Sequence, residues 1–143
     1  MTIEPFSAYE VDDDPRRIDI ALVWQFLSTQ AYWNRWRTFD DVERQWREAW
    51  RVVGVYDERD GAMVGGARAI SDGVSDAYLG DMFIVPQHRG RGLSKRLLAT
   101  MIDEGPGRDF RWMLVTSDAH GLYAQFGFGV PDNRVMVRPP RQG

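Results

Sequence analysis

The sequence contains no cysteine among its 143 residues, and this absence excludes three classes of protein. Disulfide scaffolds, thiolate zinc sites and enzymes with a cysteine nucleophile all need thiols. The two histidines, His88 and His120, lie far apart in the sequence, so we expect no metal site either. A chain without cysteine suits a reducing compartment, and we expect a cytoplasmic protein.

Long apolar runs and lysine are also scarce. No run approaches the roughly 18 residues that a membrane span needs, and residues 1–9 lack the pattern of a signal peptide. Lys95 is the only lysine, arginine carries the other positive charges, and the formal net charge is −3. This acidic balance does not favour nucleic-acid binding. We therefore expect neither a membrane nor a nucleic acid as partner.

The patterns that are present predict one α/β domain over residues 1–143, with a mixed sheet and helices on its faces. Apolar residues at a spacing of four predict helices over residues 18–29 and 39–50, the second capped by Thr38. The predicted strands are 51–56, 63–70, 77–85 and 110–116, with further ones at 6–11 and 135–137. Two more helices are expected, one over residues 93–102 and a short one that is capped by Ser117 or Asp118 and ends at Gly127.

The loop between the third strand and its helix carries most of the chemical information. It reads Gln87-His88-Arg89-Gly90-Arg91-Gly92. The first turn of a helix has unpaired N–H groups and a partial positive charge. Two glycines allow close approach, and two arginines add charge, so the loop suits a phosphate or pyrophosphate. The alternative is a structural turn with solvated arginines.

Other phosphate loops fit this segment less well. A P-loop requires Gly-Lys-Ser/Thr, whereas Leu93 follows Gly92 here. The dinucleotide fingerprint requires a third glycine at the position of Lys95. The loop instead resembles the Gln/Arg-x-x-Gly-x-Gly/Ala signature of the GNAT superfamily of N-acetyltransferases. A second segment, from Leu122 to Phe128, is similar to the Leu-Tyr-x-x-Phe-Gly-Phe sequence of many members.

The resemblance implies a GNAT-like fold with a mostly antiparallel, splayed sheet, and acetyl-CoA as cosubstrate without a metal. The main chain of Phe83 and Val85 would pair with the pantetheine arm as an added strand, and residues 111–116 would form the other side of the opening. Ser94, where the family often has Gly or Ala, is small and carries a hydroxyl that can donate to phosphate. The implied cofactor-binding residues are Phe83, Ile84, Val85, Arg89, Gly90, Arg91, Gly92, Leu93, Ser94, Thr116 and Tyr123.

Tyr123 is the implied general acid. A thiol has a pKa of about 8.5 and a phenol about 10, so the phenol can protonate the leaving sulfur without being ionised beforehand. The alternative is a core aromatic residue with one satisfied hydroxyl. Since an acetyl-cysteine intermediate cannot form, we expect direct attack by the amine in a ternary complex.

Asp81 is the candidate general base, because it interrupts an otherwise apolar strand. A buried carboxylate needs a partner or a shifted pKa, and such groups are common at functional sites. The equal alternative is a structural hydrogen-bond hub for loop amides or an arginine. His120 is either a base near the thioester or a surface residue.

The acceptor side is expected at the junction of the first two helices, where Tyr32 and Trp33 lie between helical segments. With Asp81 and His120 they form the predicted substrate-binding set, while tryptophans at helical spacing are assigned to the core. The expected acceptor is a primary amine of a small molecule or a peptide. The competing interpretation is a non-catalytic acyl-CoA-binding or interaction module on the same fold. A homodimer is one assembly that the resemblance allows.

Overall fold

Five strands form one mixed sheet in the computed structural model, which describes residues 8–34 and 36–141. The strand order is β1-β2-β3-β4-β5, antiparallel except for the parallel pair β4 and β5. This confirms the predicted mixed α/β fold. The strands are β1 (Tyr9–Asp12), β2 (Arg51–Asp57), β3 (Met63–Ser71), β4 (Asp76–Ile84) and β5 (Arg111–Met113).

Within the described residues four α-helices flank the sheet, and two of them begin at a polar capping side chain. Asp19 caps α1 by accepting a hydrogen bond from the Leu22 amide, and Thr38 and Asp41 form a reciprocal capping box at the start of α2. The helices are α1 (Ile20–Gln30), α2 (Phe39–Arg47), α3 (Leu93–Leu98) and α4 (His120–Ala124). Short helical turns occupy Pro15–Arg17, Tyr32–Asn34 and Pro86–His88, and α3 continues as a π-helical segment over Ala99–Asp103.

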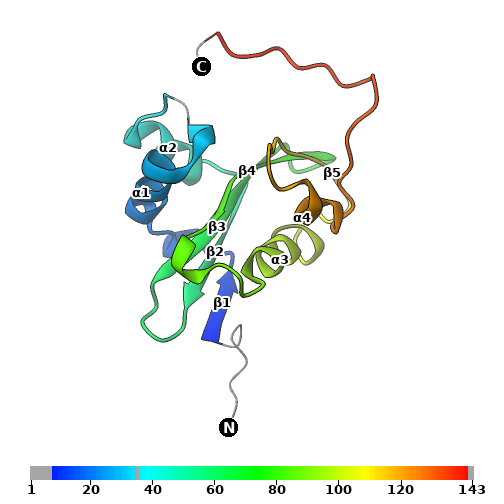
Figure 1. Cartoon of the computed structure of the whole chain (residues 1–143). Helices are drawn as coiled ribbons and strands as arrows, with labels where there is room; N and C mark the ends of the chain where they lie inside the picture. The colour runs from blue at the N-terminus through cyan, green and yellow to red at the C-terminus, as the bar shows by residue number, and fades with distance from the viewer. Residues whose placement is uncertain (1–7, 35, 142–143) are drawn as a thin grey trace.

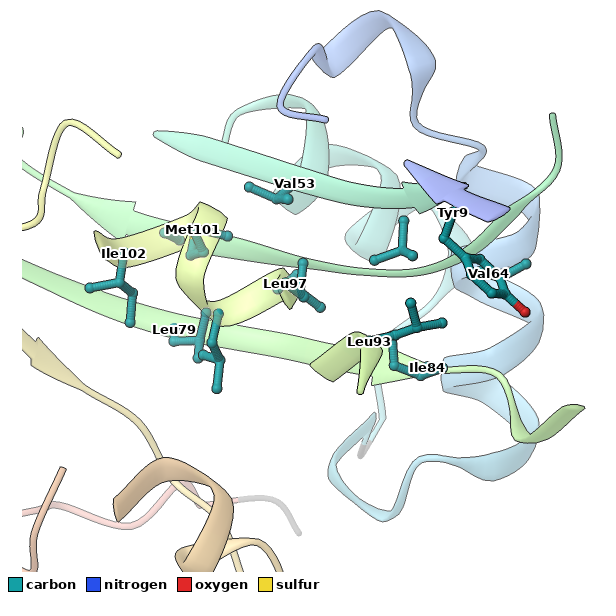
Figure 2. Packing of buried hydrophobic residues seen from close by; sticks show 13 residues of the cluster. Tyr9, Val53, Val64, Leu79, Ile84, Leu93, Leu97, Met101 and Ile102 are labelled. Carbon is teal, nitrogen blue, oxygen red and sulfur yellow. The ribbon is translucent and has the colours of Figure 1, made fainter. Parts of the chain in front are cut away.

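The sheet lies between two helical layers (Figure 1). Helices α1 and α2 cover one face and α3 covers the other, with α4 beside α3. Figure 2 shows Leu93 and Leu97 of α3, and Met101 of the π-helical segment that follows it, directed at the sheet. All three are at most 2% exposed, so burial of this apolar stripe holds α3 in place. The position of the loop that precedes α3 follows from this packing.

An irregularity in the pairing of β4 determines where the Asp81 side chain lies. The register of β3 against β4 shifts between Gly66 and Arg68, so that two residues of β4, Asp81 and Met82, oppose Ala67. Asp81 has a φ of 54°, the only positive φ of a non-glycine residue within the described residues. A bulge of this kind re-aims side chains, and here it directs a carboxylate toward the α1–α2 side.

Most predicted elements are confirmed to within a few residues, and two predictions are wrong. Residues 135–137 form no strand, and Met136 is 92% exposed. They follow β5, which is only three residues long, and a strand needs a neighbour to pair its backbone. The predicted caps of α4 are also wrong, because its N-cap is Ala119. Residues 6 and 7 of the predicted first strand lie outside the described residues. No helix within the described part of the chain has the length and apolar character required to cross a membrane.

Candidate active site

A cavity opens where β4 and β5 part. The two strands pair only from Asp76 and Arg111 to Tyr78 and Met113. Beyond this point residues 79–84 and 114–116 line opposite sides of a cavity of about 760 Å³. Parallel strands that separate leave backbone groups free along both edges. The structure therefore has the splayed opening that we expected, with residues 114–116 as its second wall.

The glycine-rich loop borders this cavity and has unpaired amides. Gly90 and Gly92 have φ of 79° and 74°, and no atom of a residue beyond their chain neighbours lies within 4 Å of the place where either would carry a Cβ. No hydrogen bond joins the backbone amides of residues 90–95 to another described residue. Leu93 contributes only its backbone, because its side chain is buried in the core. The amides and the start of α3 together fit a pyrophosphate group.

The loop's arginines are held against the protein. Arg89 Nε donates to the Ile84 carbonyl over 2.9 Å. Arg91 Nη1 donates to the Tyr9 hydroxyl over 2.8 Å, and this hydroxyl lies 2.7 Å from His88 Nδ1. These contacts tie the loop to β4 and β1. Its conformation is consequently fixed before any ligand binds, which lowers the entropic cost of binding.

The backbone of β4 changes one expectation about the pantetheine arm. The Val85 amide already donates to the Val64 carbonyl of β3 over 2.9 Å, so it is not available to a ligand. Backbone groups of successive residues alternate sides along a strand, so Phe83 also faces β3, where it pairs with Gly66. The main chain of Ile84 points toward the opening instead, and its carbonyl accepts from Arg89. The expected pairing through Phe83 and Val85 is wrong, because both face the neighbouring strand.

Tyr123 lies in the cavity, on α4. Its hydroxyl donates to Met82 Sδ over 3.6 Å, and its ring packs edge-on against Phe128. Burial raises the pKa of Tyr123 to about 12, and the charges of Tyr32 and Asp118 act in the same direction. The phenol therefore keeps its proton throughout the neutral range. Because sulfur is a weak acceptor, this proton can be redirected to a stronger one.

Asp81 is surrounded by donors. Arg37 donates to both carboxylate oxygens over 2.9 Å, Arg68 Nε to Oδ2 over 2.7 Å, and Trp33 Nε1 to Oδ1 over 3.1 Å. Burial alone would raise the pKa of Asp81, but the hydrogen bonds and charges of the two arginines outweigh it, and the pKa is lowered. A carboxylate in this environment is ionised and a weak base. Of the two roles considered for Asp81, the arrangement favours a structural hydrogen-bond hub over a general base.

The acceptor-side residues lie in different places. Tyr32 and Trp33 both line the cavity, and the Tyr32 hydroxyl accepts from the Ser117 amide over 3.0 Å, which joins the α1–α2 connection to the β5–α4 loop. His120 is exposed at the start of α4 and is not among the cavity residues. The cavity residues of the predicted sites are Tyr32, Trp33, Asp81, Phe83, Ile84, Arg89, Ser94, Thr116 and Tyr123.

Two polar residues that cap neither end of α4 also line the cavity. Thr116 Oγ1 accepts from the Ala119 amide over 3.1 Å and so closes a turn before α4. Asp118 lines the cavity and forms no ion pair with any described residue. The sequence suggested a helix cap for Asp118, whereas in the structure Asp118 lines the cavity and its Oδ1 accepts a hydrogen bond from Thr116 Oγ1 over 3.5 Å.

Sequence reasoning missed Arg37, Arg68 and Met82. Arg68 gave a usable signal, because it interrupts the apolar strand of residues 63–70 just as Asp81 interrupts the next one. Arg37 gave none, since it stands in a polar segment and reaches Asp81 only through the tertiary fold. Among the described residues, no group of three or more His, Asp or Glu side chains is placed to hold a metal ion.

Comparison with known proteins agrees with this geometry. A model of the acetyltransferase (GNAT) family matches residues 20–128. A crystal structure from Xanthomonas campestris pv. campestris, assigned to the GNAT acetyltransferases, is 38% identical with a TM-score of 0.84, covering 92% of this chain and 93% of that one. A structure from Deinococcus radiodurans R1, also assigned as an acetyltransferase, shares the fold at 20% identity and a TM-score of 0.73, with coverage of 96% and 93%. A curated protein of Gibberella zeae, assigned in the same way, is 28% identical over 88% of this chain and 81% of its own length.

Proposed function

This chain belongs to the acetyltransferase (GNAT) family, and we propose that it transfers an acetyl group from acetyl-CoA to a primary amine of a small molecule or peptide. The observation that carries the proposal is a single cavity that is lined by Arg89 and Ser94 on either side of the two loop glycines, by the opening between β4 and β5, and by Tyr123. One elongated ligand can therefore have its phosphates at the loop and its reactive end near Tyr123.

Acetyl-CoA would supply an activated thioester. Its pyrophosphate would be held by the amides of residues 90–95, and its pantetheine arm by the Ile84 main chain in place of the Arg89 side chain. The residues Ser94 and Thr116 would line its path. Apart from the displaced Arg89 side chain, the elements that would hold these groups are formed without the cofactor, so positioning of the two reactants would supply a large share of the rate enhancement.

Tyr123 would donate its proton to the sulfur that leaves. With a pKa of about 12, the phenol gives up its proton only as negative charge develops on the sulfur, so it acts during bond cleavage. A positioned acid of this kind is worth about two to four orders of magnitude in rate. A partly buried phenol at the reactive end of the cavity favours an enzyme over a module that only binds acyl-CoA.

Deprotonation of the amine is assigned to Asp118. A lysine-like amine has a pKa of about 10.4 and is almost entirely protonated at neutral pH. Asp81 is occupied by two arginines, whereas Asp118 lines the cavity without an ion-pair partner among the described residues. Its charge also contributes to the raised pKa of Tyr123, so the two groups are close enough to interact. Asp118 would take the proton directly or through a water molecule.

The test is to add acetyl-CoA to the purified protein, first alone and then with a panel of primary amines. We expect a higher melting temperature with acetyl-CoA, and release of free thiol with at least one amine. If saturating acetyl-CoA leaves the melting temperature unchanged, the cofactor assignment fails. If acetyl-CoA binds and no amine in a broad panel releases thiol, the chain is an acyl-CoA-binding module.

A further inference from the structure

The acceptor side of the cavity contains a buried excess of positive charge. Two arginines, Arg37 and Arg68, share the single carboxylate of Asp81. The Arg68 and Asp81 residues are only 7% and 6% exposed, and the Arg37 side chain is 14% exposed. A buried charge without a partner is costly. One positive charge of this group therefore remains to be balanced by something that enters the cavity.

The two arginines differ in how many of their N–H groups form hydrogen bonds. Arg37 donates through Nε to the Asn34 carbonyl and through both terminal nitrogens to Asp81, with a further bond to Gln45. Arg68 donates only through Nε, to Asp81. Its two terminal nitrogens form no hydrogen bond with any described residue, although Arg68 lines the cavity. These N–H groups are available to a ligand.

This local charge is not a general property of the chain, whose formal net charge is −3. The charged residues of the cavity wall are Arg37, Arg68, Arg89, Asp81 and Asp118. Arg89 is bound to the Ile84 carbonyl on the cofactor side. The cavity thus offers the terminal nitrogens of Arg68 and the carboxylate of Asp118, which accepts one hydrogen bond from Thr116 and forms no ion pair with any described residue.

We propose that the acceptor is an amino acid or a similar amine that also carries a carboxylate, which Arg68 binds while the ammonium group lies toward Asp118. A planar guanidinium with two free nitrogens matches the geometry of a carboxylate. The aromatic residues Tyr32, Trp33 and Tyr78, which line the same cavity, would contact the apolar body of the acceptor. This inference rests on the proposed acetyl transfer and narrows its substrate class.

The experiment compares matched acceptors. A series of ω-amino acids of increasing chain length is assayed against the corresponding amino carboxamides, and phosphoethanolamine against ethanolamine. We expect the best carboxylate to exceed its carboxamide by at least about tenfold in kcat/KM, mainly through KM. Arg68→Gln should remove this preference, with a loss for the carboxylate that exceeds the loss for the carboxamide by roughly tenfold to hundredfold. Arg68→Lys should retain part of it.

Arg111→Gln is the control, because Arg111 pairs with Asp76 on the exposed surface and does not line the cavity. It should leave the preference intact, and an unchanged response to acetyl-CoA shows that each variant is folded. Equal rates with carboxylates and carboxamides would overturn the inference while leaving acetyl transfer standing, as would equal losses on both in Arg68→Gln. If phosphoethanolamine exceeds ethanolamine by more than the carboxylates exceed their carboxamides, the anionic group of the acceptor is a phosphate, and the proposal of a carboxylate is overturned.

A binding measurement separates this inference from the proposed function. Calorimetry of the CoA-loaded protein with the carboxylate and carboxamide ligands needs no turnover. Binding of the carboxylate alone, lost in Arg68→Gln, supports the anion site even if no amine is acetylated. If neither ligand binds, or both bind equally, the anion site is refuted.

Discussion

Arg68 and Asp81 lie on neighbouring strands with Nε 2.7 Å from Oδ2, at the point where β4 is bulged. Asp81 reaches this position through a left-handed backbone conformation, with φ of 54°. Such a conformation is strained for most residues and is best tolerated by Asn, Asp and Gly. The ion pair therefore stabilises the bulged backbone, and the bulge in turn places the carboxylate within reach of Arg68.

Replacing Asp81 by Asn should destabilise the protein strongly. Asn tolerates the same backbone conformation, so the change isolates the charge. It leaves Arg37 and Arg68 buried without an anion, and breaking a buried pair costs about 3–5 kcal/mol. Chemical denaturation measures this loss, and Asp76→Asn, which removes the exposed partner of Arg111, should cost less than about 1 kcal/mol.

The same pair sets an acid limit on stability. Because the pKa of Asp81 is lowered in the folded state, its stabilisation is present above its unfolded pKa of about 3.9 and is lost as the pH falls below that value. Wild-type stability should decrease over this acid range, and the decrease should be smaller in Asp81→Asn. Equal acid sensitivity of the two proteins would contradict the assigned ion pair.

Tyr123→Phe should lower kcat by about 10²–10⁴-fold, because the proton donor is lost and the ring is kept. The affinity for acetyl-CoA, measured by calorimetry, should change little, since the loop and β4 are untouched. Equal losses in turnover and cofactor affinity would show that Tyr123 has a packing role. The alkaline limb of the wild-type rate profile should not begin below about pH 10, because the phenol has a pKa of about 12.

Asp118→Asn should reduce turnover most at neutral pH. A lysine-like amine is nearly all protonated at pH 7 and about half neutral near pH 10.4, so an acceptor for its proton matters less as the pH rises. The ratio of wild-type to variant kcat/KM, measured from pH 7 to pH 10, should fall toward one. A constant ratio would show that Asp118 acts in another way.

Gly92→Ala should weaken acetyl-CoA binding more than it weakens the fold. Gly92 and Gly61 have nearly the same φ, 74° and 75°, and both have open space where a Cβ would stand. The backbone cost of alanine is about 1–2 kcal/mol at either position. Only Gly92 belongs to the loop with unpaired amides, so Gly61→Ala is a matched control with unchanged cofactor affinity. Similar affinities in the two variants would exclude the loop as the phosphate site.

Tyr56→Phe should stabilise the protein or leave it unchanged at pH 7, and protect it in alkali. The Tyr56 hydroxyl is buried without a partner among the described residues, and removing such a group avoids its desolvation cost. Burial raises the pKa of Tyr56 to about 12, against an opposing contribution from Arg17. The wild-type free energy of unfolding therefore does not depend on Tyr56 ionisation below pH 10. Between pH 10 and pH 12 it decreases by about 1.4 kcal/mol for each pH unit, because the unfolded state loses the phenol proton first. Denaturation curves at pH 8 and pH 11 measure the difference.

The order of helices and strands could be predicted from the sequence because local patterns determine them. The spacing of Leu93 and Leu97 produces one apolar stripe, and Thr38 starts a helix through contacts within a single turn. The strand predicted at residues 135–137 failed for the opposite reason. Strand formation there depends on a neighbour, and β5 ends at Met113. Pairing is a property of the whole sheet.

The sequence by itself determined the family and the glycine-rich loop, since both depend on residues that are adjacent or at fixed spacing. Only the tertiary structure decided what Asp81 does. Its partners, Arg37, Arg68 and Trp33, come from three other segments of the chain, and a carboxylate's pKa depends on the charges around it. The same folding that made this candidate base an anchor placed the unpaired terminal nitrogens of Arg68 and the carboxylate of Asp118, which has no ion-pair partner among the described residues, in one cavity.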